Sequence, residues 1–147
     1  MLTEITDRQI AMLVRHEDRP LVVCDVDDRR AADLAESVAA ATGCNARVGE
    51  PDPRGCEIVI NATPLGMKPG DPMPVDPDRL EPGSVVVDIV NARDPTPLCR
   101  AAAARGCRTQ GGRPMHEGQA VHALRFLGFD YLPEGRPVSD TPKEYRG

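Results

Sequence analysis

Residues at the ends of four strand-like stretches of the sequence are the first candidates for chemistry. They are Asp25, the triplet Asn61, Ala62 and Thr63, the pair Val90 and Asn91, and the pair Gly111 and Gly112. A carboxylate at the end of a buried strand can accept hydrogen bonds from ribose hydroxyls. Glycine lets a backbone approach a ligand closely, because it has no Cβ. The residue types therefore fit a nucleotide-like ligand at one edge of a sheet.

Each of these positions also has a purely structural interpretation. Asp25 is followed by Asp27 and Asp28, and acids in this stretch favour the dipole of a helix that begins near Arg29. Asn and Thr side chains commonly hold the turn after a strand, so the residue types at 61 and 63 fit an ordinary turn as well. On the residues alone, both interpretations stay open.

The elements that must position these residues alternate along the chain. We predict strands over residues 21–25, 45–48, 56–61, 84–90 and 107–110, and helices over residues 7–16, 29–42, 97–105 and 114–127. A Pro- and Gly-rich loop covers residues 63–83, with a turn of helix near residues 78–80, and a polar tail covers residues 131–147. The apolar strands lack polar alternation, which predicts a parallel α/β sheet buried on both faces.

Composition narrows the class of protein. With 147 residues, 40% of them apolar, the chain can bury the core of one domain. A net charge of −5 argues against nucleic-acid binding through phosphate contacts. No run of 18 apolar residues predicts a membrane span, and the first residues lack the apolar stretch of a signal peptide, so we expect a cytoplasmic protein.

The five cysteines are scattered and form no Cys-x-x-Cys pair. This spacing indicates neither a zinc site nor a disulfide framework. We expect plain thiols that are buried or half-buried.

Four stretches together resemble the shikimate dehydrogenase family. NATPLGM at residues 61–67 resembles its Asn-Ala-Thr-x-x-Gly-Met signature. The other stretches follow in family order over about residues 7–128: VVCDVDDRRAADLA, SVVVDIVNARDPTPLCRAAAARGC and GGRPMHEGQAVHALRFLG. The resemblance implies a Rossmann-like, mostly parallel sheet with flanking helices over residues 1–130. It also implies NAD(P)-dependent hydride transfer on shikimate or 3-dehydroshikimate type substrates.

The resemblance carries roles over to individual positions. Asp25 stands where NADP-using members have Asn, and Val26 replaces their phosphate-binding Arg, so NAD is favoured over NADP. The other implied cofactor contacts lie along the turn after the third predicted strand and beside the nicotinamide: Asn61, Ala62, Thr63, Ile89 and Gly112. Gln119 matches the glutamine that binds substrate hydroxyls, and Asn91 replaces the family's substrate-contacting Tyr.

The chain also departs from the family pattern. The family's substrate domain, its catalytic Lys–Asp pair, and its first strand with a Gly-rich loop have no counterpart, and neither Lys68 nor Lys143 matches the catalytic lysine. We therefore assign no catalytic residue and expect no turnover by the chain alone. Without the first strand, we expect the strands at 21–25 and 57–61 to pair directly, or another chain to supply the missing piece.

Three functional interpretations follow. The first is a dinucleotide-binding oxidoreductase domain completed by a separate substrate-domain chain. The second is a non-catalytic truncated relic, and the third is a self-associating structural or regulatory protein. The expected partners are a small-molecule substrate and either a homo-oligomer or a separate substrate-domain chain, with no nucleic acid and no membrane.

Overall fold

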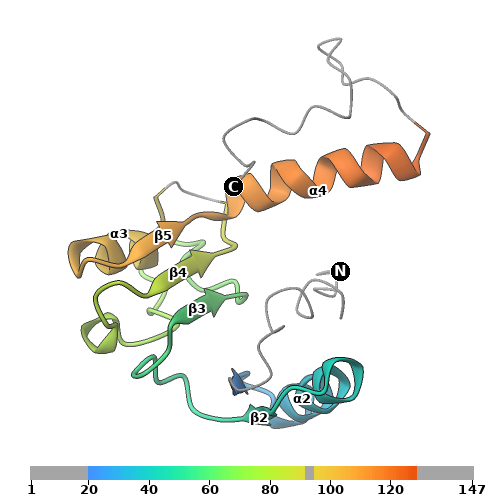
Figure 1. Ribbon diagram of the computed structural model, residues 1–147. Coiled ribbons are helices and arrows are strands. Elements are labelled where there is room, and N and C mark those ends of the chain that lie inside the picture. The colour runs from blue at the N-terminus through green and yellow to red at the C-terminus, as the bar shows by residue number, and fades with distance from the viewer. Residues whose placement is uncertain (1–19, 92–94, 129–147) are drawn as a thin grey trace, which may run out of the picture. The chain divides into compact units, whose positions relative to one another are not determined.

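The computed structural model describes residues 20–91 and 95–128, which form a parallel α/β arrangement (Figure 1). The predicted helix at residues 7–16 and the polar tail at residues 131–147 lie outside the described residues. The chain divides into two compact units, Met1–Pro51 and Asp52–Gly147.

The first unit is a strand–helix–strand motif. Strand β1 (Leu21–Val23) pairs in parallel with β2 (Ala46–Val48), and helix α2 (Asp28–Thr42) connects them. The Asp27 carboxylate caps α2 by accepting hydrogen bonds from the backbone N–H groups of the first turn. Gly43 ends the helix with φ of 74°, a conformation that glycine adopts at little cost. The helix buries one stripe of small side chains, at Ala31, Ala35 and Val38.

The second unit contains three parallel strands in the order β3 (Ile58–Asn61), β4 (Val85–Asp88) and β5 (Arg108–Gln110). A short 3-10 helix, η1 (Pro77–Arg79), interrupts the long loop between β3 and β4. Helix α3 (Pro97–Ala104) connects β4 to β5, and α4 (Gly112–Phe126) follows β5. All predicted strands and helices within residues 20–91 and 95–128 are confirmed, although each strand is shorter than expected.

The core of the second unit lies between the sheet and α3. Its buried members come from the strands, the loop and the helix: Val59, Leu80, Val86, Leu98, Ala102 and Cys107. The other side of β3 is different, because Ile58 is 47% exposed and Ile60 is 41% exposed. Within the second unit, the prediction that both faces of this strand are buried is not met. An apolar run does not bury itself, and no described element of this unit packs over these two side chains.

The family places one more strand between β1 and β3. Within the described residues, β1 belongs to a two-stranded sheet and β3 to a separate three-stranded sheet. The direct pairing of these two strands stays a prediction. Completion by another chain stays a prediction.

The cysteines follow the expectation with one exception. Cys44, Cys99 and Cys107 are buried and Cys56 is half-buried, whereas Cys24 is exposed at the point where the chain leaves β1. No helix in the described part of the chain is long and apolar enough to cross a membrane.

The packing of α3 onto the sheet gives a first testable prediction. Leu98 is 1% exposed, so Leu98→Ala leaves a cavity and should lower the free energy of unfolding by about 2–5 kcal/mol. Urea denaturation followed by circular dichroism measures this loss. The control is Ala103→Gln at an exposed position of the same helix, which should change stability by no more than about 0.5 kcal/mol. Equal effects of the two substitutions would contradict this assignment of the core.

Candidate functional site

Three of the predicted site positions in the second unit, namely Asn61, Ile89 and Gly112, lie at the same edge of its sheet. In parallel strands the carboxyl ends lie at the same edge, and Asn61 is paired in register with Asp88 at the ends of β3 and β4. The Ile89 backbone N–H then donates to the Asn61 carbonyl at 3.1 Å, which extends this pairing by one residue. This edge is where open α/β sheets bind ligands.

Gly112, which follows β5 and begins α4, also lies at this edge. A Cβ atom at Gly112 would lie 2.2 Å from the Ile89 carbonyl oxygen and 2.7 Å from Asn91 Oδ1. These distances are far inside van der Waals contact, so only glycine fits. The first residue of α4 is therefore held directly against the chain that leaves β4.

The triplet at the end of β3 forms a turn held by its own side chains. Asn61 Oδ1 accepts hydrogen bonds from the Thr63 backbone N–H at 3.1 Å and from the Thr63 hydroxyl at 2.7 Å. Asn61 Nδ2 donates to the Leu65 carbonyl at 3.2 Å and to Asp88 Oδ1 at 2.9 Å. An Asn side chain has two donors and room for two accepted bonds, so the Asn61 amide is fully used. The structural interpretation of this turn is therefore confirmed.

This saturation limits what the turn can offer to a ligand. Asn61 is 3% exposed, whereas Ala62 is exposed and Thr63 is half-buried. A ligand along the turn would meet the backbone and the Ala62 methyl group rather than the Asn61 side chain. The role expected for Asn61 as a direct contact thus becomes a role in holding the turn.

The sequence analysis assigned no role to Asp88. This acid is 1% exposed and accepts three hydrogen bonds: from Asn61 Nδ2, from the Val90 backbone N–H at 3.1 Å, and from the Thr96 hydroxyl at 2.7 Å. A buried charge is costly unless such donors surround it. A lone acid inside the apolar run SVVVDIV was the signal that could have revealed it.

Asp25 lies in the first unit and is described separately. It is exposed, and its Oδ1 accepts a hydrogen bond from the Asp27 backbone N–H at 2.9 Å. Capping of α2 falls to Asp27, and the neighbouring Val26 side chain is fully exposed. Asp25 therefore supports the turn before α2 and presents its carboxylate to solvent after β1.

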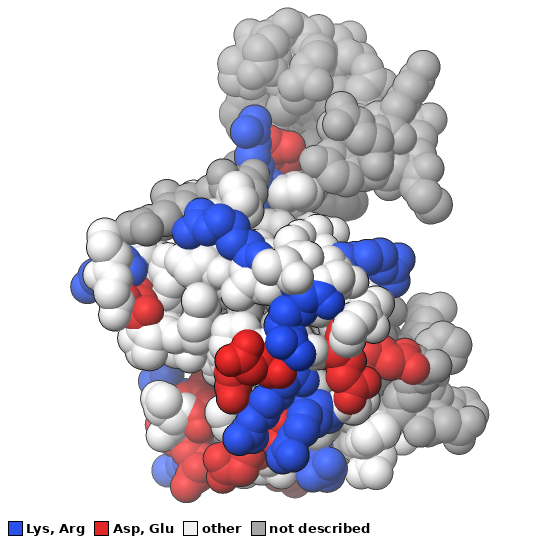
Figure 2. Space-filling view, turned by 90° about the vertical axis from the view of Figure 1, so that its left-hand side faces the viewer, with Lys and Arg blue, Asp and Glu red and all other residues white. Residues whose placement is uncertain are grey.

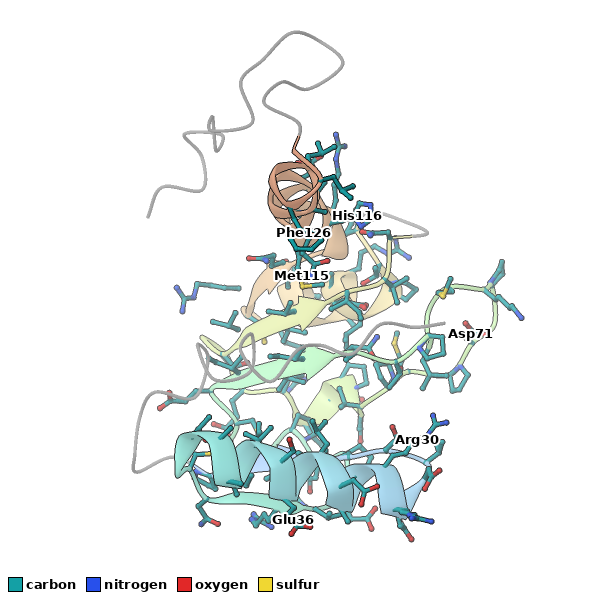
Figure 3. The ribbon with its side chains drawn as sticks, turned by 90° about the vertical axis from the view of Figure 1, so that its right-hand side faces the viewer. Arg30, Glu36, Asp71, Met115, His116 and Phe126 are labelled. Carbon is teal, nitrogen blue, oxygen red and sulfur yellow. The ribbon has the colours of Figure 1, made fainter. Side chains whose placement is uncertain are left out.

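Gln119 is not brought to the carboxyl edge of the β3–β4–β5 sheet. It is exposed on α4, seven residues after Gly112, which corresponds to about 10 Å along a helix. In Figure 3, Met115 lies on the side of α4 nearer the strands, and it is half-buried. His116 is exposed.

The loop after β3 is ordered by an acid of its own. Asp71 Oδ2 accepts hydrogen bonds from the backbone N–H of Lys68 at 2.8 Å and of Gly66 at 3.2 Å (Figure 3). A hollow of about 160 Å³ lies within this loop, and Pro64, Leu65, Met67, Lys68 and Asp71 line it. It is too small for a dinucleotide, because even drug-sized ligands occupy about 300–1,000 Å³.

A larger hollow of about 420 Å³ lies at the amino ends of the strands. Its lining includes Glu57, Glu81 and Arg108. It is at the wrong edge for a ligand of a parallel sheet, since such ligands bind beyond the carboxyl ends. Within residues 20–91 and 95–128, no three His, Cys, Asp or Glu side chains gather as a metal site would require.

Basic and acidic side chains alternate on the face shown in Figure 2. Before β3, the Arg54 guanidinium donates hydrogen bonds to both oxygens of Asp52, and Arg79 lies 3.4 Å from Asp52 Oδ2. The hydrogen bonds from Arg54 lower the pKa of Asp52 from 3.8 to about 2. Pairs this exposed contribute little to stability, and this group lies apart from the carboxyl edge.

Comparisons with known proteins identify the family. No family model matches the chain. The chain is 39% identical over 126 residues to the quinate/shikimate dehydrogenase (NAD(+)) of Corynebacterium efficiens, a match that covers 80% of this chain and 44% of that protein. It is 40% identical over 82 residues to the shikimate dehydrogenase (NADP(+)) of Pelodictyon phaeoclathratiforme, covering 54% of this chain and 29% of that protein. The chain belongs to the shikimate dehydrogenase family. It spans less than half the length of these relatives.

Solved structures of relatives agree with the Rossmann-like fold class. Quinate dehydrogenase from Corynebacterium glutamicum in complex with NAD is 32% identical with a TM-score of 0.72, and the match covers 95% of this chain and 50% of that one. A 5-ketofructose reductase of Gluconobacter sp. strain CHM43 is 26% identical with a TM-score of 0.69, covering 82% and 47% respectively. The parallel sheets with flanking helices are thus Rossmann-like, as expected. The comparisons favour an NAD(P) oxidoreductase domain over the relic and the self-associating protein.

The close approach at Gly112 gives a second prediction. Gly112→Ala should lower the free energy of unfolding by about 1–3 kcal/mol, because the added methyl group overlaps the Ile89 carbonyl. Gly118→Ala on the same helix is the control, since its Cβ would meet open space and alanine favours a helix by about 1 kcal/mol. Thermal and urea denaturation of both variants measure the difference. A stabilising Gly112→Ala would contradict the contact.

The Asp52 group gives a third prediction, on pH. A carboxyl pKa held below its ordinary value means that the ionised form is favoured in the folded state. The stabilising effect is present above pH 3.8 and is lost as the pH falls toward about 2. Carbon-13 NMR titration should give Asp52 a pKa of about 2, and Arg54→Gln should return the pKa of Asp52 toward 3.8. An unchanged titration in Arg54→Gln would show that Arg54 is not the cause.

Proposed function

We propose that this chain is the dinucleotide-binding part of a shikimate- or quinate-type dehydrogenase and that it prefers NAD to NADP. The observation that carries the proposal is the carboxyl edge of the β3–β4–β5 sheet, where Gly112 lies so close to Ile89 that only glycine fits and where the turn at residues 61–63 ends the neighbouring strand β3. Such a closely packed edge fits a flat ring laid against backbone. Bound NAD would supply the hydride acceptor of the reaction.

We assign a binding role to each residue of the proposed site. Ala62, Thr63, Ile89 and Gly112 line the nicotinamide end through backbone and small side chains. Asp25 accepts hydrogen bonds from the adenosine ribose hydroxyls. Gln119 on α4 binds substrate hydroxyls.

The preference for NAD rests on charge. A 2′-phosphate beside Asp25 would meet a like charge, and Val26 offers no cation to offset it. Arg30, one of the two arginines in the first turn of α2, already pairs with Asp27 at 3.5 Å. The Corynebacterium relatives that support this choice carry NAD(+) in their names.

Proton transfer and most substrate contacts are assigned to a separate substrate-domain chain, and Lys68, on the loop after β3, is given no catalytic role.

The exposed Ile58 and Ile60 are consistent with cover by another chain or by a second copy of this one. The expected location stays cytoplasmic, and the proposed domain stays within residues 1–130.

Calorimetric titration with NADH and NADPH tests the cofactor assignment. We expect tighter binding of NADH, and Asp25→Asn should shift the ratio of the two affinities by about tenfold toward NADPH, or about 1.4 kcal/mol. The reason is that the amide removes the charge but can still accept the bond from Asp27. Asp33→Asn, an exposed acid of α2, is the control with the same charge change and should leave the ratio unaltered. No binding of either dinucleotide at millimolar concentration would end the proposal.

Activity measurements test the assignment of proton transfer to another chain. The purified chain alone should show no NAD-linked oxidation of shikimate or quinate, because general acid–base help is worth about 10²–10⁴-fold and we assign that role to no residue within 20–91 and 95–128. Addition of a substrate-domain polypeptide from a relative should restore oxidation. Robust turnover by the chain alone would overturn this part of the proposal.

A further inference from the structure

The end of β4 brings together groups from three different segments at one buried carboxylate. Asp88 Oδ1 accepts from Asn61 Nδ2 at 2.9 Å and from the Val90 N–H at 3.1 Å, and Oδ2 accepts from the Thr96 hydroxyl at 2.7 Å. The three side chains of this network are buried: Asp88 is 1%, Asn61 is 3% and Thr96 is 0% exposed. Buried networks of this kind are rigid when every member is satisfied.

The carboxylate decides how the Asn61 amide is turned. A carboxylate accepts and does not donate, so the NH₂ group of Asn61 must face Asp88. The Asn61 carbonyl oxygen is then left facing Thr63, where it receives the two hydrogen bonds that shape the turn. The conformation of residues 61–63 thus follows from a hydrogen-bond acceptor on the neighbouring strand.

The same carboxylate sets the path of the chain after β4. Its bond from the Val90 N–H fixes the bend that carries Ile89 toward Gly112, where the Ile89 carbonyl leaves no space for a Cβ. Its bond from Thr96 ties this bend to the start of α3, where the Thr96 hydroxyl also accepts from the Cys99 N–H at 3.2 Å. The Asp88 carboxylate therefore positions both walls of the carboxyl edge, which are the turn at residues 61–63 and the Ile89–Val90 backbone.

We propose that Asp88 is the positioning residue of the nicotinamide end of the dinucleotide site. It acts through Asn61 on one wall and through the Ile89–Val90 backbone on the other, and touches no ligand itself. This inference rests on the proposed function, because the site it positions is the proposed dinucleotide site.

The test compares two ligands that differ in the nicotinamide ring. Asp88→Ala should weaken binding of NADH about tenfold and leave binding of ADP-ribose unchanged, since ADP-ribose lacks the ring. Asp88→Asn should restore NADH affinity to within about twofold, because its Oδ1 can still accept from Asn61 and Val90. Ser84→Ala is the matched control: it removes a buried hydroxyl at the other end of β4, where Ser84 contacts Cys107, and should change neither affinity.

A double-variant comparison tests whether Asp88 acts through Asn61. Asn61→Ala should reproduce the selective loss of NADH affinity, and it also decides the question if Asp88→Ala does not fold. Combining the two substitutions should cost little more than either alone. Fully additive losses, an unchanged NADH affinity in Asn61→Ala, or equal losses for NADH and ADP-ribose would overturn the positioning role.

Amide hydrogen exchange separates this inference from the proposed function. In Asp88→Ala, exchange of the Thr63 and Val90 amides should accelerate at least tenfold while the Gly106 amide, bonded to Ala103 in the same unit, keeps its rate. If the wild-type chain binds neither NADH nor ADP-ribose but this local acceleration occurs, the proposed function fails and the positioning role of Asp88 stands. Uniform acceleration across the unit would reduce Asp88 to a general contributor to stability.

Discussion

Three hydrogen-bond donors converge on the Asp88 carboxylate at the point where β4 leaves the sheet, and the carboxyl edge depends on this convergence. Removing any one partner would leave a buried polar group unsatisfied, which costs about 1–3 kcal/mol. The acid therefore persists inside an otherwise apolar strand because Asn61, Val90 and Thr96 all require it. The turn after β3, the bend after β4 and the start of α3 are consequences of the same group.

The carboxyl edge is shaped by backbone more than by reactive side chains. Asn61 uses all of its hydrogen-bonding groups on the turn and on Asp88. Gly112 contributes by having no side chain. Such a surface suits a flat, weakly polar ring better than a highly charged group. Recognition by charge is assigned instead to Asp25 in the first unit.

Local signals in the sequence were sufficient for the elements and their ends. Asp27 before α2, Gly43 after it, and Thr96 with Pro97 at the start of α3 are caps whose residue types act within a few positions of themselves. Features that depend on distant segments were not predictable in this way. The two side chains that donate to Asp88, those of Asn61 and Thr96, are 27 and 8 residues away, and the space that excludes a Cβ at Gly112 is set by Ile89. The apolar run of β3 likewise gave no sign that Ile58 and Ile60 would stay uncovered.

Chemical-shift mapping of the nitrogen-15-labelled chain during titration with NADH shows directly whether the dinucleotide binds at the carboxyl edge. We expect saturable shifts at the backbone amides of Ala62, Thr63, Ile89 and Gly112, with the amides of Gly55 and Arg108 at the amino ends of the strands unaffected. Shifts confined to the amino-end hollow, or no saturable shift at the carboxyl edge, would contradict binding at this edge.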